Sequence, residues 1–197
     1  MRRFRFSALI VIVGILVPAA GCQAQVQIEN ADEQIAGAVL PAPEELRDSV
    51  MVYGYDVDGN LVTLREGTND LICLADKPGD ETFRAACYHV SLEPYMTRGR
   101  ELRAEGVERQ ESFRIRHEEA DAGTLKMPSA PAAVYNVSAP LAEFDPATAT
   151  VGLYALYIPH ATTATTGLPE RPSGPGAPWI MRPGTPSAHI MISPPRN

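Results

Sequence analysis

The stretch "GTNDLICLADKPGDETFRAACYHV" (residues 67–90) holds two of the three cysteines of the 197-residue chain. Its Gly-Thr-Asn start is typical of a tight turn, because Gly and Asn tolerate the left-handed backbone that such turns need. The apolar "LICL" that follows and the later "FRAACYHV" favour two strands, with the loop "DKPGD" (76–80) between them. The stretch therefore predicts a turn, a strand, a loop and a second strand, with one cysteine on each strand.

Strand and helix patterns continue on both sides of this unit. An Asp58-Gly59-Asn60 turn between β-rich runs predicts a hairpin. Apolar residues at helical spacing predict an amphipathic helix over 92–105, in which Gly99 would mark a close packing contact. The charge-dense "ERQESFRIRHEEA" (108–120) favours a second helix, although "FRIRH" also alternates with strand period. Its arginines and glutamates are expected on a solvated face, with a binding strip as the alternative.

The C-terminal part has a different composition. Thirteen of the 18 prolines lie beyond residue 127, where the β-type runs "AAVYNVS", "VGLYALYI" and "HIMI" are separated by long loops. Trp179 and Met181 are expected to pin one of these loops onto the body of the protein. We predict an α+β fold: a small antiparallel sheet, one or two helices and a proline-rich C-terminal wrap.

The N-terminus has the pattern of a secretory signal peptide, which we assign to residues 1–21. Arginines at positions 2, 3 and 5 precede the apolar run "SALIVIVGILV" (7–17), Pro18 and the small residues of "AAGC" (19–22). The apolar run is shorter than the roughly 20 residues that span a bilayer. The sequence therefore predicts export, with residues 22–48 as a flexible tether and 49–197 as a single globular domain.

"AAGC" also resembles the bacterial lipobox, in which a small residue precedes a cysteine that is acylated. Ala20, Gly21 and Cys22 match, whereas Ala19 stands where that motif usually carries leucine. Acylation would make the chain a lipoprotein that faces the periplasm or the cell exterior, with the lipid bilayer as its partner. The alternative is plain cleavage nearby, for example after Ala24.

The charge of the mature chain restricts its other partners. From residue 22 onward, 14 Lys and Arg stand against 24 Asp and Glu, a net charge of −10. An acidic surface repels nucleic acid, so we predict no nucleic-acid partner. An envelope protein or a small molecule remains as a possible partner.

The chemistry of Cys73 and Cys87 has three interpretations. Export and the even pair left after acylation favour a disulfide. A metal site would need Cys73, Cys87 and His89 with either His160 or His189, but no metal-ligand spacing brings these residues together. A redox-active pair is least favoured, because there is no CxxC motif.

The sequence favours a non-enzymatic role without a cofactor. It has neither a G-x-S-x-G elbow nor a phosphate-binding glycine loop. Aromatic, His and Met residues near the C-terminal strands could instead line a small-ligand pocket, or simply pack as core and loop anchors; these are Tyr154, Tyr157, His160, Trp179, Met181 and His189. The alternative is a periplasmic metal-binding or hydrolytic enzyme that uses the His/Cys cluster.

Several motifs together resemble an uncharacterised family of small exported bacterial proteins. The shared marks are "GTN" (67–69), "CLAD" (73–76), Cys87, "LEPYMTRGREL" (92–102) and "HIMI" (189–192). The chain departs from that family in "DLI" after the turn, where Gly-Trp-Thr is usual, and in the added charged segment 107–126. The resemblance implies export and a shared fold, and no activity.

Overall fold

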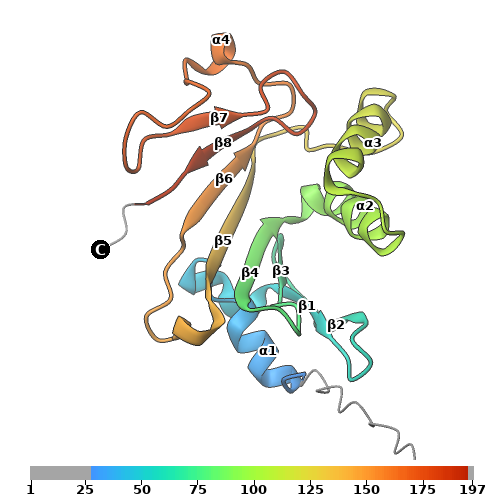
Figure 1. Cartoon of the computed structure of the whole chain (residues 1–197), viewed down its shortest axis with the longest axis vertical. Coiled ribbons are helices and arrows are strands. Elements are labelled where there is room, and N and C mark those ends of the chain that lie inside the picture. The colour runs from blue at the N-terminus through green and yellow to red at the C-terminus, as the bar shows by residue number, and fades with distance from the viewer. Residues whose placement is uncertain (1–27, 195–197) are drawn as a thin grey trace, which may run out of the picture.

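One mixed sheet organises the protein (Figure 1). The computed structural model describes residues 28–194, so the predicted signal peptide and Cys22 lie outside the described residues. The strand order is β2-β1-β3-β4-β5-β6-β8-β7, and all neighbouring pairs are antiparallel except β1 and β3. The strands are β1 Met51–Tyr55, β2 Leu61–Arg65, β3 Leu71–Leu74, β4 Thr82–His89, β5 Ala132–Pro140, β6 Leu153–Tyr157, β7 Trp179–Met181 and β8 His189–Ile192.

The α+β prediction is confirmed, but the sheet is larger than the small one expected. Its eight strands extend from the β1/β2 hairpin at one end to β7 and β8 at the other (Figure 1). The proline-rich segment contributes to this size, because Trp179 and Met181 lie in β7 and not in a loop. Prolines leave β7 only three residues long, as expected for an edge strand.

The helices are α1 Ala31–Ala38, α2 Glu93–Ala104, α3 Arg109–Asp121 and α4 Thr163–Thr166, with 3₁₀ helices η1 Glu44–Ser49, η2 Val90–Leu92 and η3 Leu141–Glu143. The two predicted helices are thus present as α2 and α3. Gly106, with φ of +79°, follows the end of α2 and turns the chain into α3. Among residues 28–194, no helix is both long enough and apolar enough to cross a bilayer.

Part of the predicted flexible tether is folded onto the sheet. Asn30 and Glu33 form a reciprocal capping box that starts α1. At the other end of this helix, Ala38 is completely buried, in the same apolar cluster as Val52. The prediction of a tether is therefore wrong for residues 31–48, because α1 and η1 supply one layer of the core.

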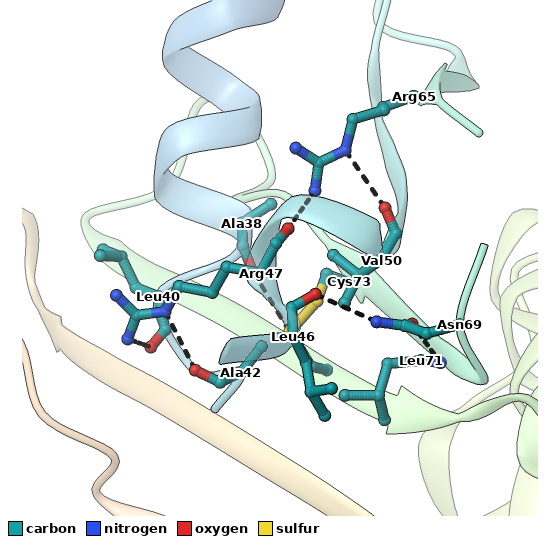
Figure 2. The surroundings of a disulfide bond; sticks show 11 residues. Ala38, Leu40, Ala42, Leu46, Arg47, Val50, Arg65, Asn69, Leu71 and Cys73 are labelled. Atoms are coloured by element: carbon teal, nitrogen blue, oxygen red, sulfur yellow. Dashed lines mark hydrogen bonds between the residues drawn. A yellow bond between two sulfur atoms is a disulfide. The ribbon is translucent and has the colours of Figure 1, made fainter. Parts of the chain in front are cut away.

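The predicted disulfide between Cys73 and Cys87 is present. The register of β3 and β4 places the two residues directly opposite each other, with their Cα atoms 4.0 Å apart. Both cysteines are fully buried beneath α1 and η1. Figure 2 shows how side chains around the bond tie η1 to its neighbours, for example Asn69, which donates to the Leu46 carbonyl at 3.0 Å.

The two faces of the sheet carry different layers. Successive strand residues point to opposite faces, so Cys73 faces α1 while Ile72 belongs to a second cluster with Tyr88 and Leu92. Leu92 leads directly into α2, which together with α3 forms a helical hairpin over this second face. The candidate site lies between that hairpin and the sheet.

Candidate functional site

Three of the six predicted pocket residues come together on the second face of the sheet. Tyr157, His189 and Met181 occupy matching register positions on β6, β8 and β7. The Tyr157 and His189 rings stack with their centroids 4.7 Å apart. All three side chains line one cavity, so this part of the predicted cluster exists.

The other three predicted residues lie elsewhere. Tyr154 is on the opposite face of β6, where its ring meets Tyr135 edge-on at 5.8 Å. Trp179 borders a separate hollow in the proline-rich segment 172–177. His160 has a mostly exposed side chain, 3.9 Å from an Asp121 carboxylate oxygen. The prediction of one pocket lined by all six residues is therefore wrong, because Tyr154 faces the other side of the sheet, Trp179 lies on the edge strand and His160 lies in a loop.

The alternative metal set is also dispersed. The sulfurs of Cys73 and Cys87 are bonded to each other and are not free thiolates. The Nδ1 atom of His89 on β4 contacts the Ser91 hydroxyl at 2.8 Å, whereas His189 lies three strands away on β8. In the part of the chain that the structure describes, no three His, Cys, Asp or Glu side chains are placed to hold a metal ion.

Two clefts adjoin each other beneath the α2/α3 hairpin. One, of about 620 Å³, lies mainly between α2 and α3, and the other, of about 360 Å³, extends over strands β4 to β8. They are lined in common by Leu74, Met96, Arg109, Phe113 and Tyr157. Because the two clefts share these residues, we describe them together as one groove.

Arginines line this groove, and two of them belong to the segment 108–120 whose charges were expected on a solvated face. Arg116 is buried and Arg182 is half-buried, whereas Arg103 and Arg109 are exposed. Arg103, Arg109, Arg116 and Arg182 each have no carboxylate oxygen within 4.0 Å among residues 28–194. The guanidinium carbons of Arg182, Arg116 and Arg109 lie 3.4, 4.9 and 5.9 Å from the centroid of the Phe113 ring. Three cations therefore surround one aromatic side chain.

Arg116 is the most enclosed of these cations, with only 8% of its surface exposed. Its guanidinium lies 4.1 Å from the centroid of the Tyr95 ring. It donates from Nε to the Ser112 carbonyl and from Nη1 to the Tyr95 carbonyl, both at 3.2 Å. Burial lowers its pKa, and the nearby Arg182 and Arg103 lower it further.

Gly99 makes room for this arginine. A Cβ atom added at Gly99 would lie 2.7 Å from Nη1 of Arg116 and 3.1 Å from Cζ. The glycine was predicted to mark a close packing contact, and this contact is with the Arg116 guanidinium. The small residue on α2 therefore fixes where the buried cation of α3 lies.

Two tyrosine hydroxyls accompany the arginines. The Tyr95 hydroxyl is buried and has no hydrogen-bond partner in the described part of the chain. Burial and the neighbouring Tyr95 raise the pKa of Tyr157 to about 12, so its hydroxyl stays protonated at neutral pH. A buried donor without a partner costs roughly 1–3 kcal/mol, which marks Tyr95 as an unsatisfied group beside an unpaired cation.

A serine–histidine contact closes one side of the groove. Nε2 of His117 on α3 lies 2.6 Å from the Ser187 hydroxyl, just before β8. Burial lowers the pKa of both His117 and His189, and Arg182 lowers each of them further. Only 1% of Ser187 is exposed, so the contact holds α3 against β8 and does not present a nucleophile to solvent.

This arrangement is suited to binding an anion. It offers several guanidinium groups without carboxylate partners, two tyrosine hydroxyls and two histidines whose pKa is lowered first by burial and then by the nearby Arg182. Sequence reasoning missed Arg116 because its burial depends on the face of α3 that it occupies. Scans against models of protein families, curated proteins and solved structures found no match for this chain.

Proposed function

We propose that the protein is an exported, lipid-anchored and non-enzymatic binding module that holds a small anionic ligand between the α2/α3 hairpin and the sheet. The observation that carries the proposal is the unpaired arginine cluster of Arg103, Arg109, Arg116 and Arg182. The chain has a net charge of −7, so carboxylates for pairing these cations are plentiful. Their concentration without partners in one groove is a specific feature of the fold.

The energetic argument concerns Arg116. A buried charge without a counter-charge costs several kcal/mol, and cation–π contacts with Tyr95 and Phe113 offset about 0.5–2 kcal/mol each. An anion at the groove would supply the missing counter-charge through short, charge-assisted hydrogen bonds. It would also give the Tyr95 hydroxyl an acceptor. The ligand-bound state is then lower in free energy for reasons local to these side chains.

Lipid anchoring rests on the "AAGC" motif at Cys22. Residues 23–30 connect that cysteine to α1, and this segment can extend by at most about 30 Å. An acylated chain would hold its binding groove close to a membrane surface. The Cys22→Ala variant is expected to move from the membrane fraction to the soluble fraction, and unchanged membrane partitioning would refute the anchor.

Thermal unfolding tests the binding proposal. A ligand that binds only the folded protein raises its melting temperature, so phosphate, sulfate and citrate should stabilise the Cys22→Ala protein more than chloride at equal ionic strength. Arg116→Met should abolish this difference. Arg114→Met is the matched control, because Arg114 is an exposed residue of the same helix that pairs with Glu111 and Glu118. Equal melting temperatures in all four anions would refute the proposal.

A further inference from the structure

We propose that the ligand is a single-chain amphiphile, with one anionic head at the arginines and an unbranched hydrocarbon chain along the sheet. This inference rests on the proposed anion site and adds the class of molecule that occupies it. The head would lie at Arg109, Arg116 and Arg182, where the two clefts meet. The chain would lie in the cleft of about 360 Å³ over strands β4 to β8.

The floor of that cleft is apolar. Val134 on β5 and Ala155 on β6 face each other across the strand pair, and Met191 of β8 continues the same row. Leu153 and Met191 remain partly exposed although they point toward the helical hairpin side. Partly exposed apolar side chains in a groove are typical of a surface that a ligand covers.

Several polar groups along this floor are already engaged, and the side chain of Asn136 is a further polar group that lines it. The Tyr88 hydroxyl donates to a Glu93 carboxylate and accepts from Arg100 at 3.0 Å. The Ser187 hydroxyl is held by His117, and His189 contacts the Ser187 carbonyl through Nδ1 at 2.7 Å. Between the arginines and the far end of the groove, the floor therefore offers mainly apolar contact.

Shape and side-chain type favour one flexible chain. Three of the six methionines of the protein line the groove, at Met96, Met181 and Met191. Methionine is unbranched and adapts to irregular partners. The volume is near the lower limit of about 300–1,000 Å³ for small-molecule pockets, which suits a single-chain molecule better than a two-chain lipid.

A chain-length series tests the inference. Acetate, hexanoate, octanoate, decanoate and dodecanoate are titrated as monomers into the Cys22→Ala protein at a pH where the carboxylates are ionised. Isothermal titration calorimetry gives the Kd of each acid, because the single tryptophan, Trp179, borders a different hollow. Each methylene that enters the groove should tighten the Kd by about fourfold. Arg182→Met should weaken every member of the series by a similar factor.

Two alanine variants locate the chain. Ala86 is partly exposed on the groove floor, so Ala86→Leu should fill the groove and remove the chain-length dependence. Ala133 is also partly exposed, but it lies on the opposite face of the sheet, so Ala133→Leu is the matched control and should bind like the parent. Equal loss in both variants would overturn the location of the chain.

The outcomes separate this inference from the proposed function. If phosphate and all carboxylates bind equally and depend on Arg116, the anion site stands and the amphiphile is refuted. If neither phosphate nor any carboxylate binds, both are refuted. Comparison of dodecanoate with a lysophosphatidylglycerol of the same chain length then distinguishes a free fatty acid from a lipid head group, and tighter binding of either supports an amphiphile.

Discussion

The contact between Gly99 and Arg116 gives the sharpest prediction, because one substitution should have opposite effects in two backgrounds. Gly99→Ala removes a glycine from the interior of α2, which by helix propensity alone stabilises the protein by about 1 kcal/mol. The same methyl group would lie 2.7 Å from Nη1 of Arg116. The guanidinium must therefore move, although it is enclosed by Tyr95 and Phe113.

The magnitude follows from the bond that the movement breaks. Nη1 donates to the Tyr95 carbonyl at 3.2 Å, and a hydrogen bond to a charged group contributes about 1.5–3 kcal/mol. After the gain in helix propensity, Gly99→Ala should lower the free energy of unfolding by about 0.5–2 kcal/mol. In the Arg116→Met background the obstructing atoms are absent, so the same change should raise it by about 1 kcal/mol.

Urea unfolding of the parent, both single variants and the double variant measures the coupling. The expected interaction energy between the two sites is about 1.5–3 kcal/mol. Far-ultraviolet circular dichroism follows the transition, and the slope with urea should stay constant across the four proteins. A Gly99→Ala substitution that stabilises the parent as much as it stabilises Arg116→Met would show that the arginine is not held against α2.

Three further predictions concern the rest of the fold. Cys73→Ala with Cys87→Ala should lower the free energy of unfolding by about 3 kcal/mol for this sequence separation of 14, and reductant should reproduce that loss in the parent but not in the variant. Burial lowers the pKa of His189, so its contribution to the free energy of unfolding is present above the unfolded pKa of about 6.5 and is lost as the pH falls from there toward the folded pKa. His189→Asn should therefore flatten the pH dependence of the free energy of unfolding, measured in urea, over that range. An unchanged pH dependence would exclude His189 as its source. Gln34 is buried and both donates to the Tyr55 carbonyl and accepts from its N–H, so Gln34→Leu should cost about 1–3 kcal/mol in chemical unfolding, and a cost near zero would contradict these bonds.

The elements that sequence predicted well are those with short-range signals. The Asp58-Gly59 turn needs a positive φ, which is +80° at Gly59, and it joins β1 and β2 as expected. Cys73 and Cys87 lie on neighbouring strands because only one short loop separates them. In such cases the residues that fix the conformation lie within about 15 positions of each other, so their pattern is visible in the chain.

The elements that sequence missed depend on distant partners. The polar segment before residue 49 was expected to be a tether, although Asn30 and Glu33 carry a capping-box signal. Its helix is stable because Ala38 packs on the disulfide-bonded strands, and that surface is formed by residues far along the chain. The three-residue β7 likewise exists because β8 pairs with it.

The site was only partly predictable for a related reason. Arg114 and Arg116 belong to one helix and have similar neighbours in sequence, yet Arg114 is paired and exposed whereas Arg116 is buried. The two differ in the face of α3 that they occupy, and that face is set by contacts such as the one between His117 and Ser187, 70 positions apart. Residue type and charge density therefore could not distinguish the buried cation from the solvated one.

The overall charge of the protein constrains which anions the groove can favour. The net charge of −10 from residue 22 onward creates a repulsive field for approaching anions, and that repulsion grows with each charge a ligand carries. The field is screened beyond about 8 Å at physiological ionic strength, so attraction must arise within the groove, where the unpaired guanidinium groups of Arg116 and Arg182 lie. A ligand with a single negative charge meets the least repulsion. Contact with the apolar side chains of Val134, Ala155 and Met191 can raise its affinity without adding charge. The acidic exterior and the apolar groove floor thus both favour a monoanionic amphiphile over a multiply charged ligand.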